Sequence, residues 1–385
     1  MRFADNRNKI GKYIPAVVFL IFIYGMALWF IFSPKPDYSS SEKRYLQKFP
    51  EVTAEKLLSG EFGSEFETFF ADRFPQRNTW VGLNAYTALA VGNNGASGVY
   101  NCKNGYLINK PVSTENNLDK NIGAVADFAK SIDAHTTVML VPSTGYIVDD
   151  VLPTFHDKYN DDEDISKISS TLSKDKIGFV DLRERFKSEY KNGSQLYYKT
   201  DHHWTTKGAY TGYQELCKTL GITPIDDSTL KKDSYPDFYG TTYSSSGFWL
   251  TPPDNIEIWN NPKNSDRNIS VKITEGANIK TSGSMYFTNH LKEDDKYPVF
   301  IDGNHALTEI TNTNAKNGTI LLIKDSFSHS LAPFLAENYS KVVLVDLRYY
   351  KESVSDLVTT YNPEQVVVLY GIDNLATDTD IVWLK

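Results

Sequence analysis

Cysteine is scarce in this chain of 385 residues, where only Cys102 and Cys217 are present. Two cysteines exclude a disulfide-rich framework, although they could pair with each other outside a cell or both remain as buried thiols. They cannot build a structural zinc site unaided, because such a site takes four ligands. We therefore expect no metal ligation by these two cysteines.

The chain also lacks a net positive charge. It carries −8 at pH 7, and because residues 1–35 carry +4, the rest of the chain carries −12. A field of this sign repels nucleic acid and other polyanions at long range, so we expect no nucleic-acid partner. Internal repeats, heptad runs and low-complexity tails are absent from the sequence as well, which argues against a solenoid or a coiled coil.

One long hydrophobic run stands out near the N-terminus, since residues 14–32 carry no charge. At about 1.5 Å per residue such a helix just spans a hydrocarbon core of ~30 Å. Four basic residues precede the run against one acidic residue, a bias that keeps the N-terminus cytoplasmic. A cleaved signal peptide is the alternative, but no small-residue cleavage site follows the run. We therefore predict a cytoplasmic tail (1–12), a single-pass plasma-membrane anchor (13–33) and an extracellular remainder.

The remainder divides into two parts. Residues 34–95 read as a juxtamembrane linker and a helical region, in which Phe62, Phe66, Phe69 and Phe70 mark one helix face. In residues 96–385, short apolar runs such as Ile320 to Ile323 alternate with helix-length segments. This alternation predicts an α/β domain with a parallel sheet flanked by helices. Residues from about 222 to 315 break the pattern and predict a β-rich insertion.

Two segments carry residues suited to acyl transfer. Ser326 follows the apolar run 319–323, and ligands of open α/β sheets bind at the carboxyl ends of strands. Asp201 and His203 fall on one side of an extended segment, so the carboxylate could orient the imidazole as in a Ser-His-Asp triad. Other interpretations stay open, namely His202 as the base, a surface loop with a packed Trp204, or a metal site. Because adjacent histidines rarely converge on one ion, we predict no metal.

Together these segments resemble the DHHW family, relatives of the alginate O-acetyltransferase family with its SGNH-hydrolase-like domain. The resemblance is carried by the following motifs: Thr200-Asp201-His202-His203-Trp204, Thr206-x-Gly208-Ala209-Tyr210, Glu67-x-x-Phe70-x-Asp72-Arg73-Phe74-Pro75-x-Arg77, Gly105-Tyr106-Leu107, Val141-Pro142, Gly303-Asn304-His305 and Lys324-Asp325-Ser326-Phe327. The relatives acetylate hydroxyls of exported polysaccharide through a triad whose Asp-x-His pair precedes the serine. The same order holds here.

Carried over residue by residue, the resemblance implies that Ser326 is the nucleophile, His203 the general base and Asp201 its orienting carboxylate. The chain departs from the hydrolase pattern at Lys324, where hydrolases carry the glycine of a Gly-Asp-Ser block. The candidates for a second oxyanion donor or a substrate contact are Asn304, Tyr370, Asn374 and His202. The resemblance implies no cofactor.

The resulting expectation is an extracytoplasmic O-acetyltransferase that acts on a cell-surface or exported polysaccharide, such as a cell-wall glycan. By analogy with the relatives, a multi-spanning membrane O-acyltransferase would supply the acetyl group. The same residues would also suit an acetylesterase, because the choice between water and a sugar as acceptor depends on how the site excludes water. A non-catalytic glycan-binding or scaffold protein is a third interpretation, since fold alone does not give function.

Overall fold

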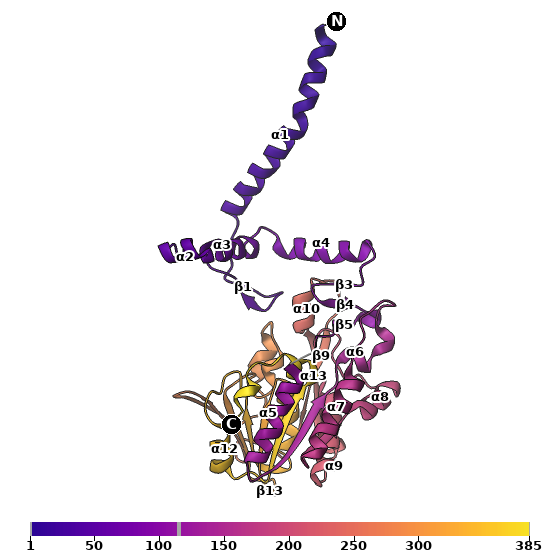
Figure 1. Ribbon diagram of the computed structural model, residues 1–385, viewed down its shortest axis with the longest axis vertical. Coiled ribbons are helices and arrows are strands. Elements are labelled where there is room, and N and C mark those ends of the chain that lie inside the picture. The colour runs from indigo at the N-terminus through magenta and orange to yellow at the C-terminus, as the bar shows by residue number, and fades with distance from the viewer. Residues whose placement is uncertain (1, 114–116, 385) are drawn as a thin grey trace. The chain divides into compact units, whose positions relative to one another are not determined.

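The computed structural model describes residues 2–113 and 117–384 (Figure 1). These residues form two compact units, which divide between Tyr86 and Thr87. The division lies inside the predicted helical region (34–95), upstream of the boundary that the sequence predicts between residues 95 and 96. It falls within helix α4 (Arg77–Ala90).

The first unit begins with helix α1 (Arg2–Phe32), whose segment Tyr13–Phe32 is long and apolar enough to cross a membrane. This helix is suited to a single-pass anchor or a signal anchor. The side chains of the predicted cytoplasmic tail, residues 1–12, lie outside the described part of the structure. The rest of the unit comprises β1 (Tyr38–Ser39), β2 (Arg44–Tyr45), α2 (Ala54–Ser59), α3 (Glu61–Asp72) and the start of α4.

The second unit is built on an eight-stranded sheet with the order β11-β10-β12-β14-β13-β15-β6-β7. Its strands are β6 (His135–Val141), β7 (Gly178–Asp181), β10 (Ile269–Glu275), β11 (Asn278–Ser282), β12 (Leu307–Asn312), β13 (Asn317–Lys324), β14 (Tyr339–Val345) and β15 (Gln365–Gly371). Strands β14, β13, β15, β6 and β7 run parallel. The predicted α/β fold with a helix-flanked parallel sheet is thus confirmed for this part of the sheet.

Helices cover both faces of the sheet because side chains alternate along each strand. On β13, Ile320 and Leu322 belong to one apolar core with residues of α9 and α11, whereas Leu321 and Ile323 belong to another with residues of α5 and α12. The helices of this unit are α5 (Asn117–Ser131), α6 (Thr144–Ile147), α7 (Asp161–Lys174), α8 (Arg183–Lys191), α9 (Thr206–Leu220), α10 (Thr241–Ser246), α11 (Ser328–Leu335), α12 (Val354–Tyr361) and α13 (Ile372–Thr377).

The segment 222–315 is rich in β-structure, as expected, but it is not a separate module. Its strands β12, β10 and β11 extend the central sheet beyond β14 through successive antiparallel pairs, so the sheet is mixed. Only β8 (Lys231–Phe238) and β9 (Asp254–Asn260) pair apart from it within this segment, as a two-stranded ribbon in the described chain. A further small sheet joins β3 (Gly95–Ala96), β4 (Val99–Asn101) and β5 (Leu107–Asn109).

The carboxyl ends of three neighbouring strands meet at one edge of the sheet. Strand β15 lies between β13 and β6, and all three run parallel. Ser326 follows β13, Ser143 follows β6, and Asn374 follows β15. Residues far apart in the sequence are therefore brought to a single edge, which is where open α/β sheets bind ligands.

Candidate active site

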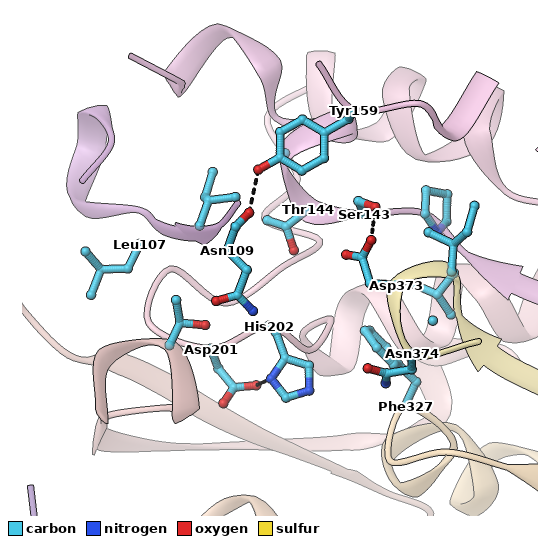
Figure 2. A pocket seen from close by; sticks show the side chains of 17 residues that line it. Leu107, Asn109, Ser143, Thr144, Tyr159, Asp201, His202, Phe327, Asp373 and Asn374 are labelled. Carbon is cyan, nitrogen blue, oxygen red and sulfur yellow. Dashed lines mark hydrogen bonds and ion pairs between the residues drawn. The ribbon is translucent and has the colours of Figure 1, made fainter. Parts of the chain in front are cut away.

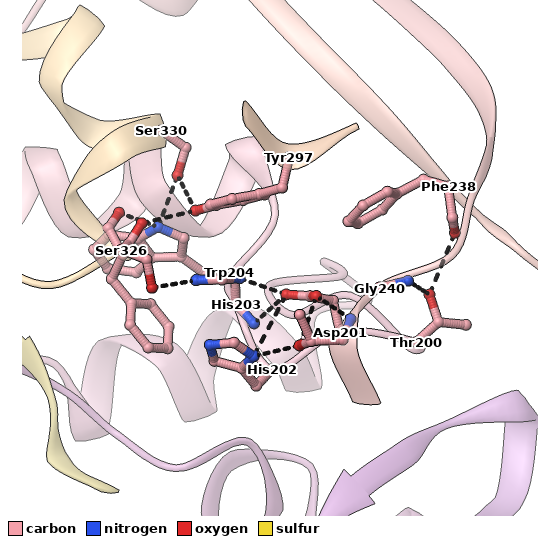
Figure 3. Close-up of polar contacts among 12 residues, drawn as sticks. Thr200, Asp201, His202, His203, Trp204, Phe238, Gly240, Tyr297, Ser326 and Ser330 are labelled. Carbon is pink, nitrogen blue, oxygen red and sulfur yellow. Dashed lines mark hydrogen bonds and ion pairs between the residues drawn. The ribbon is translucent and has the colours of Figure 1, made fainter. Parts of the chain in front are cut away.

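Ser326, His203 and Asp201 form one continuous hydrogen-bonded chain, which we call the candidate triad (Figure 3). The Oγ atom of Ser326 lies 2.6 Å from Nε2 of His203. The Nδ1 atom of His203 lies 2.5 Å from Oδ1 of Asp201. Because the carboxylate accepts the proton of Nδ1, Nε2 is left to accept the proton of the serine hydroxyl. The alternative interpretation of the sequence, in which His202 is the base, does not match this geometry.

The carboxylate of Asp201 is buried and fully engaged. Its Oδ1 also accepts the backbone N–H of His203, and its Oδ2 accepts the backbone N–H and the hydroxyl of Thr241. Although burial opposes ionisation, the neighbouring His203 and His202, together with the hydrogen bonds from His203 and Thr241, hold the pKa of Asp201 well below its usual range. Asp201 is therefore an anion across the physiological range, as an orienting carboxylate must be.

Each residue of the Asp-His-His-Trp motif has a distinct contact. The Nδ1 atom of His202 lies 2.7 Å from the hydroxyl of Thr241. Loss of hydration and the neighbouring His203 lower the pKa of His202 to about 4, so its ring is neutral at pH 7. The Nε1–H of Trp204 donates to the Phe327 carbonyl and to the hydroxyl of Ser330. Trp204 thereby ties the histidine segment to the turn that carries Ser326.

The segment around the motif is fixed by a second buried carboxylate. Asp254 at the start of β9 accepts the backbone N–H of Lys199 and both the backbone N–H and the hydroxyl of Thr200. The hydroxyl of Thr200 in turn accepts the backbone N–H of Gly240. These contacts link the motif to α10, which supplies the Asp201 partner Thr241.

The turn at Ser326 is held by Asp325, the residue before it. One oxygen of its carboxylate accepts the backbone N–H of Phe327, and the other accepts the backbone N–H of Gly371 and the amide of Asn374. Among the described residues, none accepts a hydrogen bond from the backbone N–H of Ser326. That N–H is therefore available as an oxyanion donor.

The residues named as second donors fall in different places. Asn374 lines the cleft described below, and only one of its two amide protons is needed for Asp325. Asn304 lies outside the lining, where its oxygen accepts from Arg348. Tyr370 is buried in the core on the face of α5 and α12. His202 and Asn374 line the cleft and so remain the candidates for a substrate contact or a second donor, whereas Asn304 and Tyr370 lie away from it.

A cleft lies beside the candidate triad, and Asp201, His202 and Phe327 contribute to its wall (Figure 2). Its polar lining comes from the strand ends and from the histidine segment, namely Asn109, Ser143, Thr144, Asp201, His202, Asp373 and Asn374. Ser326 itself retains 9% of its surface exposed. The cleft therefore combines these polar groups with apolar side chains such as Leu107, Ile372 and Phe327, as small-molecule sites commonly do.

Two carboxyls meet at Ser143 in the wall of this cleft. The backbone N–H of Ser143 donates to Asp161 at 2.7 Å, and its hydroxyl donates to Asp373 at 3.1 Å. Burial raises the pKa of Asp161 to about 7 and the pKa of Asp373 to about 6. We therefore expect both groups to titrate near neutral pH, which the local sequence around them does not predict.

Lys324 occupies the position at which hydrolases carry glycine. It ends β13 without a positive φ, so this position does not require glycine. Its ammonium donates to Asp346 and to Nε2 of His329, both at 2.8 Å. Nε2 of His329 therefore accepts a hydrogen bond from the buried Lys324 side chain, and His329 is not placed as a base for Ser326.

One further contact of the triad had no sequence signal. The ring of Tyr297 stacks on His203 with centroids 4.0 Å apart and planes inclined by 11°. Its hydroxyl donates to the carbonyl of Ser326 at 3.2 Å. Tyr297 lies in an irregular segment without periodicity, so its approach to His203 depends on the fold alone.

The Asp201, His202 and His203 side chains also have ligand atoms within 4.8 Å of one another, which is close enough for a metal ion. Their hydrogen bonds already account for the two Nδ1 atoms and for both oxygens of Asp201. Metal binding at these atoms would have to break the contact between Asp201 and His203. The geometry thus fits a proton-transfer chain better than a metal site.

Comparison with known proteins identifies the family of this chain. The family described as DHHW protein matches residues 105–345, which include all three residues of the candidate triad. The chain belongs to the DHHW family. A comparison with curated proteins gives no match.

The chain is also similar to solved structures. A DHHW family protein from Eubacterium siraeum has a TM-score of 0.63 at 17% identity, covering 75% of this chain and 95% of that one. PatB1 from Bacillus cereus, solved with a sulfonyl adduct, has a TM-score of 0.61 at 21% identity, covering 74% of this chain and 97% of that one. The O-acetyltransferase domain of Pseudomonas putida AlgJ has a TM-score of 0.48 at 14% identity, covering 75% and 95%.

Proposed function

We propose that this DHHW protein is a membrane-anchored, extracytoplasmic O-acetyltransferase that acetylates hydroxyls of a cell-surface or exported polysaccharide. The observation that carries the proposal is the hydrogen-bonded chain from Asp201 through His203 to Ser326 at the carboxyl edge of the sheet. The resemblance to the alginate O-acetyltransferase family gives the acyl group and the class of acceptor. The polar groups in the wall of the cleft beside the triad would bind the hydroxyls of such an acceptor.

In the first half-reaction, the Oγ atom of Ser326 attacks the carbonyl carbon of an acetyl donor while Nε2 of His203 takes the hydroxyl proton. The negative charge that develops on the carbonyl oxygen would be met by the backbone N–H of Ser326 and the second amide proton of Asn374. The bond to the leaving group then breaks, and His203 returns the proton to it. Acetyl-Ser326 remains.

In the second half-reaction, a sugar hydroxyl in the cleft attacks acetyl-Ser326. His203 takes the proton of that hydroxyl, the ester to Ser326 breaks, and the serine oxygen recovers a proton from His203. The imidazolium that forms in each step lies beside the anionic Asp201, which stabilises its charge. Atoms and protons thus balance over the cycle without any cofactor.

The acetyl donor must be present on the outer side of the membrane. Helix α1 provides one membrane span in the described chain, too little to carry an acetyl group across by itself. We infer that a multi-spanning membrane O-acyltransferase supplies the group. The charge bias of residues 1–12 supports an N-terminus in the cytoplasm and a catalytic unit outside.

The test is the O-acetyl content of the envelope polysaccharide in cells that carry Ser326→Ala instead of the wild-type protein. We expect O-acetylation to be lost, and to be unaffected by Ser170→Ala, which replaces an exposed serine on α7. Unchanged O-acetylation with Ser326→Ala would contradict the proposal. Release of free acetate with no ester on the glycan would assign the site to an esterase.

A further inference from the structure

The first unit distributes its side chains in the opposite way to a water-soluble domain. Helix α2 has no buried residue, and the only buried residue of α3 is Asp72. By contrast, the four phenylalanines of α3 all retain accessible surface, with Phe66 at 41% and Phe70 at 42% exposed. A helix that buries its aspartate and exposes its phenylalanines is expected where the surrounding medium is apolar.

The exposed rings form a single cluster with the end of the membrane span. Phe49 lies against three rings of α3, at centroid distances from 5.4 to 6.5 Å. The ring of Phe30, which lies in the last turn of α1, is 4.7 Å from Phe70 and 6.3 Å from Phe69. We call the rings of residues 49, 62, 66, 69 and 70 the aromatic face of the first unit.

Polar contacts fix α3 to the chain that leaves α1. Asp72 accepts two hydrogen bonds from Arg44 and one from the backbone of Gln47. Arg73 donates to the carbonyls of Lys35 and Pro36, directly after the span. Helix α3 is therefore held at the level where α1 ends, and Figure 1 shows α2 and α3 lying across that end.

The position of α3 determines what can cover the aromatic face. Helix α1 ends at Phe32, and the ammonium of Lys35 lies 4.1 Å from the Phe30 ring, as expected for a cation at the headgroup level. Rings attached at that level meet the boundary between headgroups and acyl chains, where aromatic side chains are favoured. Six basic and seven acidic residues lie between residues 42 and 77, so charge attraction is not the cause of binding.

We propose that the aromatic face of the first unit lies in the interfacial layer of the same bilayer that α1 crosses, so that α2 and α3 form a membrane-surface platform. The proposal rests on α1 as a membrane span and is independent of the chemistry at Ser326. Its ligand is the lipid surface itself. The platform would hold the chain that follows α1 close to the membrane rather than on a free tether.

The experiment uses the full chain in vesicles of phosphatidylcholine and phosphatidylglycerol. Single cysteines at Phe66→Cys or Thr68→Cys receive a nitrobenzoxadiazole dye, since Cys102 and Cys217 are buried. The two positions lie about 160° apart around α3, and Thr68 is on the exposed polar side. Nitroxide lipids labelled near the headgroup or near the chain end, and aqueous iodide, report the depth of the dye.

We expect the dye at Phe66→Cys to be quenched several-fold more by the shallow nitroxide than the dye at Thr68→Cys, which iodide should reach. Leu58→Cys, at a side chain 91% exposed, repeats the test where the substitution removes no packing. Gly25→Cys in α1, which has no neighbour within 4 Å, reports insertion of the span by the deep nitroxide. An inserted Gly25→Cys with iodide-accessible dye at residues 58 and 66 would overturn the proposal. Protection from both iodide and lipid quenchers would also overturn it, by assigning the face to a protein partner.

Discussion

At the scale of single residues, the proposed chemistry depends on which ring nitrogen of His203 carries the proton. Asp201 accepts from Nδ1 of His203, and this contact sets the tautomer that leaves Nε2 to act on Ser326. The motif and the strand before Ser326 suggested these three residues, and the resemblance to the DHHW family implied their roles. Thr241 and Tyr297 were not predictable, because they reach the triad from segments 40 and 94 positions after Asp201 and His203, through the fold alone.

Asp201→Asn tests the orienting role directly. The amide keeps the size of the side chain but cannot favour the same tautomer or stabilise the imidazolium. We expect the rate of acetylation of Ser326 to fall about 10³–10⁴-fold with the fold intact. Stopped-flow release of 4-nitrophenol from 4-nitrophenyl acetate measures this rate, and Asp133→Asn, at an exposed carboxylate of the second unit, serves as the control. A change below tenfold would contradict the role.

The acidic pair at Ser143 predicts a dependence of stability on pH. Burial raises the pKa of Asp161 to about 7, above the value near 3.8 of an unperturbed aspartate. The folded state therefore binds more protons than the unfolded state between these two values, and its stability falls as pH rises through that window. Below about pH 4 both states are protonated and the penalty is absent.

Asp161→Asn should remove this penalty while its oxygen still accepts the Ser143 N–H. We expect the variant to be more stable than the wild type at pH 8 by a few kcal/mol, and the difference to vanish toward pH 4. Urea unfolding at a series of pH values measures it. Asp133→Asn should give no such trend, and a variant equally destabilised at every pH would refute the linkage.

At the scale of elements, the sequence was informative about strands and helices and less so about pairing. Periodicity and apolar runs predicted the parallel part of the sheet, because each parallel strand is buried on both faces and reads as a continuous apolar run. Strands β10 to β12 were not assigned to the sheet, since their pairing with β14 is a tertiary choice that local pattern does not record. The asparagine- and serine-rich composition of that region pointed instead to an insertion.

The approach of α10 to the triad depends on a glycine. An added Cβ at Gly240 would lie 2.1 Å from Cβ of Asp201, so Gly240→Ala must displace that carboxylate. We expect the acetylation rate to fall about 10²-fold, as for a displacement of about 1 Å in a catalytic group. The control is Gly123→Ala on α5, where no atom lies within 4 Å; it should add about 0.5–1 kcal/mol of stability and leave the rate unchanged. Equal rates for both variants would contradict the account.

The end of β13 is held by the buried ion pair of Lys324 and Asp346. Lys324→Gly, which restores the hydrolase residue, leaves Asp346 with Arg348 alone and His329 without its donor. We expect a loss of about 3 kcal/mol in the free energy of unfolding, partly recovered by Asp346→Asn in the double variant. Urea denaturation of the four proteins of this cycle measures the coupling. A Lys324→Gly protein as stable as the wild type would show that the pair is dispensable.

At the scale of the whole molecule, the chain combines a membrane-suited helix with an acidic α/β unit whose cleft carries polar groups in its wall. The net charge of −12 beyond residue 35 keeps polyanions away at long range, so a glycan acceptor would be recognised by hydrogen bonds from the cleft rather than by charge. The proposed function thus places the catalytic unit, the acetyl donor and the polysaccharide on one side of the membrane. All of these assignments require that Ser326 takes an acyl group.

The most direct measurement is therefore the acylation of Ser326 itself. The full chain in detergent would be incubated with 4-nitrophenyl acetate, digested and examined by peptide mass spectrometry, with His203→Ala as the matched control. The account predicts an acetyl group on Ser326 in the wild-type protein and none in the His203→Ala protein. An unmodified Ser326 in a wild-type protein that hydrolyses the ester, or acetylation that persists without His203, would contradict it.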